Sequence, residues 1–340
     1  MVNIAVIGCG YWGPNLIRNF SSTPGAHLAA VCDLNADRLR KVSEQNPGLH
    51  TTADYAALLA SGKVDAVAIA TPVSSHFPLA KQALEAGKHV LVEKPMTATV
   101  AEAEELVALA AKKGLVLMVD HTFAYTSAVR KIKELVDTGE LGQLLYYDSV
   151  RINLGLFQHD VNVLWDLAVH DLAIMDFALG QQPVAVSATG LAHLQGQHED
   201  VAFLTCFFES SLIAHFHLNW LSPLKVRRTI IGGEKKSVVY DDIEPSEKLK
   251  IYDRGASVNE QSLESMRRTL VDYRMGDMWA PHLGQGEALR AESTHFVECI
   301  TQKKTPVTDG RAGLRVVRIL EAANESLKLR GAPVKIKAGA

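Results

Sequence analysis

Short apolar runs alternate with helix-like segments over the first 120 residues. Four of the intervening segments show the 3.6-residue spacing and the terminal residues typical of helices, at 36–44, 55–60, 75–86 and 100–113. This alternation predicts a parallel α/β sheet. The strands are expected at residues 4–7, 28–32, 50–52, 64–70, 89–92 and 115–120.

Beyond about residue 125 the pattern changes. Helices are expected at 127–138 and 162–179, with a long strand at 143–153. Six strand-like runs then follow without helices between them, which indicates a sheet of antiparallel strands. These runs are 184–191, 201–209, 212–220, 226–231, 238–240 and 249–252. Residues 254–285 are expected to be irregular, and helices at 287–301 and 311–329 end the chain. We therefore divide the chain into domains 1–122 and 123–340, with packing of the last helices on the first domain as an alternative.

The run 212–220 alternates between apolar and polar positions. Its apolar side chains are expected to face a layer of helices, and they are Leu212, Ala214, Phe216, Leu218 and Trp220. His215 and His217 lie on the opposite face, which is either solvated or a contact between subunits. Alternatively, the two histidines could bind a metal ion together, but no third ligand has a suitable spacing in the sequence, so we expect no metal.

The first strand leads into a glycine-rich turn. Gly8, Gly10 and Gly13 form the G-x-G-x-x-G pattern between a strand and a helix, the context that a dinucleotide-binding loop requires. The glycines permit a tight turn, close approach of a pyrophosphate and close helix–strand packing. Tyr11 and Trp12 are expected to line the pocket near the diphosphate or the nicotinamide.

The end of the second strand indicates the choice of cofactor. Asp33 follows Gly13 by about 20 residues, where an acid hydrogen-bonds the adenosine ribose. Leu34 comes next instead of a Ser or Arg that would accept a 2′-phosphate, so NAD is favoured over NADP. Arg38 and Arg40 on the next helix weaken this preference.

The composition is that of an ordinary globular protein, with 47% hydrophobic and 21% charged residues. A formal net charge of −3 argues against a nucleic-acid or membrane-surface partner. No apolar run approaches the ~20 residues of a membrane helix, and no signal peptide is visible, so a cytoplasmic location is expected. The four cysteines lack metal-site spacing and are expected to be buried.

Ligands of an open α/β sheet bind at the carboxyl ends of its strands. In addition to the glycine loop and Asp33, this edge carries Thr71-Pro72, Glu93-Lys94-Pro95 and Asp120-His121. Lys94 is the strongest catalytic candidate there. Pro95 restricts the backbone of Lys94, so a fixed geometry or a cis Lys94–Pro95 peptide bond is reasonable. The alternative is a surface lysine at the end of a strand.

A second group of candidates lies on the expected helix 162–179. Asp166 and His170 are four residues apart, so they share one helix face. The carboxylate would orient the imidazole or bind a sugar hydroxyl, and His170 would accept a proton. A hydrogen-bonded Asp–His pair in the core is the alternative.

These motifs together resemble the Gfo/Idh/MocA oxidoreductase family. The matching stretches are G-C-G-Y-W-G, A-T-P-V-S-S-H, V-E-K-P-M and D-L-A-V-H-D, in the family's order and spacing. The resemblance implies a Rossmann domain, then an α+β domain with an open, mostly antiparallel sheet through which dimers or tetramers often form. It implies Lys94 and His170 as the catalytic pair and Asp166 as a substrate or orienting residue. It also implies cofactor contacts from Thr71, Pro72, His76, Glu93 and Lys94. Substrate contacts are expected from His121, Arg151, Asn153, Gln158, His159, Asn162 and Asp166.

Within the family, the sequence looks like the branch that acts on nucleotide-linked sugars. This implies NAD-dependent oxidation of the C3 hydroxyl of UDP-N-acetylglucosamine, so that an aminotransferase can install an amine, as in lipid A or amino-sugar biosynthesis. The alternatives are oxidation of UDP-N-acetylglucosaminuronate, oxidation of inositol or a free sugar, and an NAD-binding regulator without catalysis.

Overall fold

The computed structural model describes residues 1–155, 161–194, 198–258 and 271–337. The chain forms two compact units. The first contains Met1–Thr126 and Gln285–Glu321, and the second contains Ser127–Gly284 and Ala322–Ala340. Each unit is described by itself.

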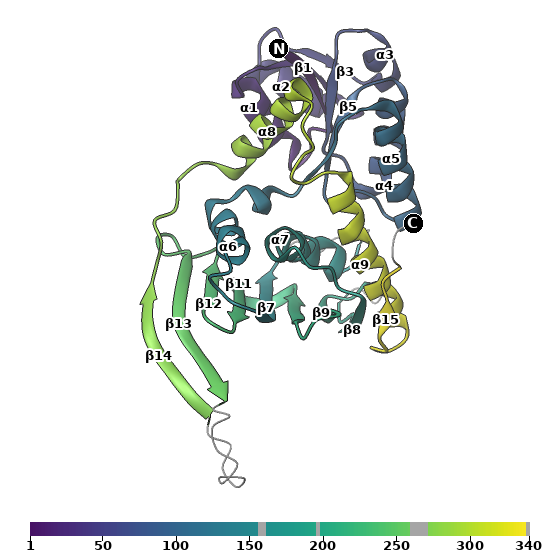
Figure 1. Ribbon diagram of the computed structural model, residues 1–340. Helices are drawn as coiled ribbons and strands as arrows, with labels where there is room; N and C mark the ends of the chain where they lie inside the picture. Colours follow the sequence, from purple (N-terminus) through teal and green to yellow (C-terminus); the bar gives the residue numbers. More distant parts are fainter. Residues whose placement is uncertain (156–160, 195–197, 259–270, 338–340) are drawn as a thin grey trace, which may run out of the picture. The chain divides into compact units, whose positions relative to one another are not determined.

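The first unit is built on a six-stranded parallel sheet in the order β3-β2-β1-β4-β5-β6 (Figure 1). Its strands are β1 (Val2–Ile7), β2 (Ala26–Cys32), β3 (His50–Thr52), β4 (Ala66–Ile69), β5 (His89–Glu93) and β6 (Leu117–Asp120). Its helices are α1 (Gly13–Ser22), α2 (Ala36–Gln45), α3 (Tyr55–Ala60), α4 (Val73–Glu85), α5 (Val100–Lys113), the 3-10 turn η1 (Thr122–Tyr125) and α8 (Ala288–Gln302). The strand order reverses between β1 and β4, which is where an open α/β sheet binds its ligand. The predicted α/β fold is confirmed.

Side-chain caps explain where several helices of this unit begin. Asn35 accepts a hydrogen bond from the backbone N–H of Arg38, and Asp54 accepts one from that of Ala57. The hydroxyl of Thr99 and the carboxylate of Glu102 form a reciprocal capping box. These contacts satisfy N–H groups that have no partner within the helix, which is why the starts of α2, α3 and α5 were predictable.

Residues 285–321 return to the first unit, and α8 lies in this segment. Phe296 of α8 packs edge-on against Phe20 of α1, with ring centroids 6.3 Å apart. Arg18 of α1 pairs with Glu287, the residue that caps α8. The final helix, α9 (Gly310–Lys328), begins in the first unit and ends in the second.

The second unit is built on a nine-stranded sheet in the order β14-β13-β12-β11-β7-β10-β9-β8-β15. All neighbouring pairs are antiparallel except β7 and β10, so the sheet is mixed and mostly antiparallel, as expected. Its strands are β7 (Leu144–Leu154), β8 (Ala185–Leu191), β9 (Val201–Phe207), β10 (Ile213–Asn219), β11 (Leu221–Gly233), β12 (Ser237–Asp241), β13 (Leu249–Val258), β14 (Val271–Trp279) and β15 (Val334–Lys335). Its helices before α9 are α6 (Ser127–Asp137), the π-helical turn η2 (Leu164–Ala168) and α7 (Val169–Leu179).

Strand β10 shows which face of the second sheet is buried. Ala214, Phe216 and Leu218 are fully buried beneath the helices, and the flanking Leu212 and Trp220 are also buried, so the predicted alternation is confirmed. Helices α6 and α7 lie on this face of the sheet (Figure 1).

The expectation that residues 254–285 are irregular is wrong for 254–258 and 271–279, and residues 259–270 lie outside the described part of the chain. Strand β13 continues to Val258 and pairs with β14 in an antiparallel ribbon that extends from the rest of the unit (Figure 1). Met275 of this ribbon is 75% exposed, and Met278 is 47% exposed. A ribbon with solvent on its faces does not need the alternation of buried and exposed residues by which strands are recognised. Hence only 249–252, the start of β13, had been predicted as a strand.

The helix expected at 162–179 is divided. Residues Leu164–Ala168 form the π-helical turn η2, and regular α-helix begins only at Val169. Such a turn accommodates one extra residue and is frequent at functional sites. Asp166 lies in the π-helical turn and His170 in the first turn of α7.

Candidate active site

The glycine loop between β1 and α1 has the shape that a pyrophosphate requires. A Cβ on Gly8, whose φ is +90°, would lie 2.5 Å from the carbonyl oxygen of Ala70, and one on Gly13 would lie 2.1 Å from that of Gly8. Only glycine fits at these two positions. At Gly10 the space is open, and the nearest atom to a Cβ is on the Arg38 side chain at 3.5 Å. The loop thus leaves room over Gly10 at the N-terminal end of α1, and fits a bound dinucleotide.

Asp33 lies at the end of β2, directly beside this loop. Its two carboxylate oxygens accept hydrogen bonds of 2.8 Å from the N–H groups of Cys9 and Asn35. Burial raises the pKa of Asp33, but these hydrogen bonds outweigh that effect and hold the pKa below its usual value. The Arg38 guanidinium lies 3.8 Å away and offsets part of the negative charge. Asp33 is therefore ionised and fixed at the position from which a ribose would be bound.

The ends of β4 and β5 are connected by His76. Its Nδ1 lies 2.9 Å from the carbonyl oxygen of Pro95, and its Nε2 lies 2.8 Å from that of Thr71. The ring is 1% exposed, so the structure gives it a bridging role instead of the direct cofactor contact that we expected. The Lys94–Pro95 peptide bond is cis, as its sequence suggested.

Trp12 and Tyr11 behave differently from each other. The indole Nε1 of Trp12 donates a hydrogen bond of 2.9 Å to the carboxylate of Asp120, so this ring is anchored within the first unit. Tyr11 is 87% exposed and stays available at the mouth of the glycine loop. His121, expected at the substrate, is 3% exposed.

In the second unit, partial exposure singles out the two candidate catalytic side chains on η2 and α7. Residues 162–176 are all buried except Asp166, Leu167 and His170. The carboxylate of Asp166 accepts a hydrogen bond of 3.0 Å from the indole Nε1 of Trp220. The only accessible surface of this segment therefore presents a carboxylate held by a buried indole, with an imidazole one turn away. Trp220 was recognised in the sequence as a core residue and not as a partner of Asp166.

Two expected substrate residues have structural roles. Arg151 is 3% exposed, and its guanidinium forms two hydrogen bonds, of 2.8 and 2.7 Å, with the carboxylate of Asp171. Asn162 accepts hydrogen bonds from the N–H groups of Leu164 and Trp165 and thereby caps the π-helical turn. Both hold the segment that carries His170 instead of facing a ligand directly.

Of the other expected substrate residues, the structure describes Asn153. Asn153 is half-buried near the end of β7. Gln158 and His159 lie outside the described residues. Lys94 belongs to the first unit and His170 to the second, so their shared role remains a proposal.

The described side chains exclude some other kinds of site. No group of three or more potential metal ligands is found among them, and all four cysteines are buried thiols. Burial and Asp33 raise the pKa of Cys9 to about 12, so this thiol in the glycine loop stays protonated. None of the helices in the described part of the chain has the length and apolarity needed to span a membrane.

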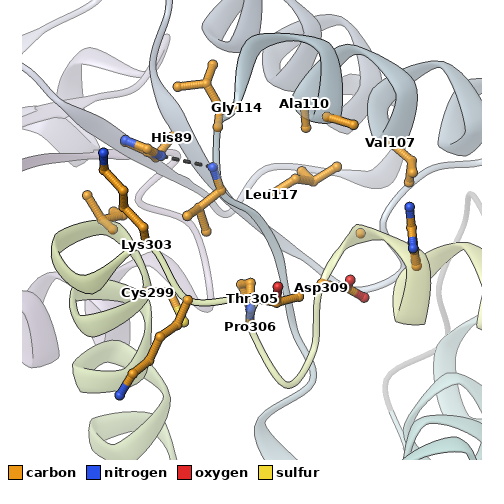
Figure 2. A pocket seen from close by; sticks show the side chains of 17 residues that line it. His89, Val107, Ala110, Gly114, Leu117, Cys299, Lys303, Thr305, Pro306 and Asp309 are labelled. Atoms are coloured by element: carbon orange, nitrogen blue, oxygen red, sulfur yellow. Dashed lines mark hydrogen bonds between the residues drawn. The ribbon is translucent and has the colours of Figure 1, made fainter.

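A cavity of about 650 Å³ lies at the opposite edge of the first sheet (Figure 2). It borders His89 and Leu117, which begin β5 and β6, and Lys303 after α8. The Nδ1 of His89 accepts a hydrogen bond of 2.9 Å from the N–H of Val116. Burial lowers the pKa of His89, which favours the neutral ring that this hydrogen bond requires. Because cofactors bind at the carboxyl ends of parallel strands, this cavity is separate from the candidate site.

Comparison with known families identifies both parts of the chain. Residues 2–121 match the NAD-binding Rossmann fold of the GFO_IDH_MocA oxidoreductase family, and residues 129–239 match the GFO/IDH/MocA C-terminal domain. The chain belongs to this family. The cofactor is accordingly NAD, in agreement with the prediction from the glycine loop and Asp33.

Individual relatives in the family differ in substrate. A UDP-N-acetylglucosamine 3-dehydrogenase of Acidithiobacillus ferrooxidans is 30% identical over 92% of this chain and 93% of its own length. A structure of that enzyme covers 96% of this chain and 98% of its own, with a TM-score of 0.81. A scyllo-inositol 2-dehydrogenase (NAD(+)) of Bacillus subtilis is 27% identical over 98% and 96% of the two chains. The family relationship thus establishes an NAD-dependent dehydrogenase of the sugar type.

Proposed function

We propose that the protein oxidises the C3 hydroxyl of UDP-N-acetylglucosamine to the 3-keto sugar. The proposal rests on the 30% identity with an enzyme of that activity, over 92% of the chain. The half-exposed Asp166 and His170, on a segment that is otherwise buried, provide the matching chemistry.

In the proposed mechanism, His170 accepts the proton of the C3 hydroxyl on a ring nitrogen. Lys94 donates a hydrogen bond to the hydroxyl oxygen and fixes its direction. Asp166, held by Trp220, orients the imidazole or binds a neighbouring sugar hydroxyl. The C3–H bond breaks with its electron pair while the C=O bond forms, and NAD, when bound, supplies the acceptor for that hydride. Glycine loop backbone N–H groups and Asp33 hold the cofactor's pyrophosphate and ribose.

Formation of NADH from a panel of substrates tests this function. The purified protein is mixed with NAD and, separately, with UDP-N-acetylglucosamine, UDP-N-acetylglucosaminuronate, scyllo-inositol and free N-acetylglucosamine. The expected result is turnover of UDP-N-acetylglucosamine with the highest kcat/KM. Turnover of the inositol alone would replace our proposal with the activity of the Bacillus relative.

The uronate is the closest alternative substrate. Its carboxylate needs a cationic partner, and Arg151, the arginine nearest the His170 segment in our sequence prediction, is already paired with Asp171. This pairing favours the uncharged sugar.

We also propose that the protein forms a homo-oligomer, a dimer or a tetramer, through the open face of the second sheet. Tyr146, Phe203 and Ile213 on that face are each between 42% and 45% exposed. The ring of Phe203 stacks on the rings of His215 and His217, with centroids 6.2 and 4.7 Å apart. These contiguous aromatic rings are typical of a surface covered in an assembly.

A further inference from the structure

Three carboxyl groups converge inside the first unit, close to the cofactor edge of its sheet. Glu93 ends β5, Asp120 ends β6, and Glu292 projects from α8. Asp120 is 3% exposed and Glu292 is fully buried. Sequence analysis placed Glu93 and Asp120 at this edge but missed Glu292, about 170 residues further along the chain.

The hydrogen bonds of the three groups are unequal. Asp120 accepts from Trp12 Nε1 at 2.9 Å and from the hydroxyl of Thr122. Glu93 Oε2 accepts from the N–H of Lys94 at 3.1 Å. Among the described residues, no N–H or O–H group donates to Glu93 Oε1, and the Thr122 hydroxyl, which is close to Glu292, donates to Asp120 instead. Both groups are instead within hydrogen-bonding reach of the Asp120 carboxyl group.

In each of these carboxyl pairs one group must carry a proton, because two ionised carboxylates cannot hydrogen-bond each other. Burial and the charge of Asp120 raise the pKa of both Glu93 and Glu292 well above the usual range. Burial alone would also raise the pKa of Asp120, but hydrogen bonds from Glu93, Glu292, Thr122 and Trp12 lower it. Glu93 and Glu292 are therefore protonated donors, and Asp120 is the one ionised carboxylate of the three.

We propose that Glu292 is a positioning residue for Lys94. Glu292 and Glu93 both donate to Asp120, so α8 fixes Asp120, and Asp120 fixes the Glu93 carboxyl group. The other oxygen of that carboxyl group accepts the N–H of Lys94, so the orientation of Glu93 sets the backbone from which the lysine side chain extends. Trp12 joins the glycine loop to the same anion. This inference rests on the proposed role of Lys94 in the oxidation.

Two substitutions of Glu292 separate positioning from simple packing. Glu292→Gln keeps an N–H donor toward Asp120, whereas Glu292→Leu keeps the volume and removes the donor. We expect kcat of Glu292→Leu to fall roughly 10- to 100-fold, as when a reacting group is misplaced, with the Kd for NAD nearly unchanged. Glu292→Gln should recover most of kcat. Glu298→Gln on the same helix serves as the matched control and should behave as wild type.

The outcomes distinguish this inference from the proposed function. An active wild type whose Glu292→Leu variant keeps full kcat, or whose Glu292→Gln variant is as impaired as Glu292→Leu, would overturn the positioning role. A wild type that fails to oxidise the UDP-sugar would instead overturn the proposed substrate, and the test would then use the substrate found in the panel.

The pH dependence of stability tests the shared protons without any activity. A buried acid with a raised pKa binds more protons folded than unfolded, so stability falls as pH rises from about 4.3, its unfolded value, toward the folded pKa. Glu292→Gln cannot ionise and removes one such contribution, while Glu93, Lys94 and Asp120 remain around it. Urea unfolding should therefore show Glu292→Gln gaining stability relative to wild type between pH 5 and pH 8. An equal difference at both pH values would show that Glu292 is not a raised-pKa proton donor.

Discussion

His170 is the residue on which the proposed chemistry depends most. Replacing it with Ala removes the proton acceptor, so we expect kcat to fall by roughly 10²–10⁴ while NAD binding is kept. Steady-state NADH formation measures the first effect, and fluorescence titration with NADH measures the second. The exposed His27, replaced by Ala, is the control. Normal turnover of the His170→Ala variant would remove this residue from the role of base.

Lys94 has a separate test, because a lysine at a strand end could instead serve the cofactor. Lys94→Ala should abolish oxidation and leave the Kd for NAD within about threefold, since the loop and Asp33 hold the dinucleotide. Lys88, in the loop before β5 and therefore at the other end of the strand from Lys94, is replaced by Ala as the control. A collapse of NAD binding would show that Lys94 is a cofactor ligand or a structural residue.

At the residue scale, the candidate site residues could be predicted from the sequence, but the residues that hydrogen-bond or pair with them could not. Asp166, His170 and Lys94 were found because short motifs carry them. The hydrogen bond from Trp220 to Asp166 and the pairing of Arg151 with Asp171 join residues 54 and 20 positions apart. A single sequence contains no signal for such pairings. Glu292 was detectable in part, because it lies on the buried face of α8 between Leu289 and Phe296, where a carboxyl group needs a partner.

At the scale of elements, the Arg151–Asp171 pair supports the helix that carries His170. Arg151 comes from β7 and Asp171 from the first turn of α7, and both side chains are 3% exposed. Asp171→Ala leaves the guanidinium buried without its carboxylate, which should lower the free energy of unfolding by about 3–5 kcal/mol. Replacing both residues, as Arg151→Met with Asp171→Leu, should recover most of that loss.

The same double variant decides what Arg151 does. If it only supports α7, the KM for the UDP-sugar stays near the wild-type value once stability is restored. A large rise in KM with stability recovered would return Arg151 to the substrate contacts that the family resemblance implied. Urea unfolding and steady-state kinetics on the same preparations make the comparison.

Elements were predictable where local chemistry sets their ends. The capped helices α2, α3 and α5 and the buried strands of the first sheet follow from Asn35, Asp54, Thr99 and the apolar runs. The π-helical turn was missed because Asn162, which caps it, equally well begins a regular helix. The rest of the β13–β14 ribbon after residue 252 was missed because its exposed side chains lack alternation.

At the scale of the whole molecule, the assembly is the first property to measure. The open face of the second sheet, with Tyr146, Phe203 and Ile213, should be covered by a second copy, giving a dimer or tetramer by light scattering coupled to size exclusion. A charged substitution there, Ile213→Glu, should shift the mass toward the monomer because it places an unpaired charge in an apolar contact. A monomeric wild type at micromolar concentration would contradict this proposal.

Sequence alone gave the class of each domain and the family, because the strand–glycine–helix pattern and the catalytic motifs are local. It suggested that the last helices pack back on the first domain but could not give the bounds 285–321, because that packing depends on contacts such as Phe20 with Phe296. Substrate choice is also a property of the assembled site, and relatives of this chain are dehydrogenases with different substrates, a UDP-sugar in one case and an inositol in another.

The most direct measurement follows a deuterium atom from the sugar. UDP-N-acetylglucosamine labelled with deuterium at C3 is incubated with the protein and NAD, and the reduced cofactor is examined by mass spectrometry. Our account predicts that the NADH formed carries the deuterium, because the C3–H bond is the one that supplies the hydride. Unlabelled NADH, or no NADH from this substrate while scyllo-inositol is oxidised, would contradict it.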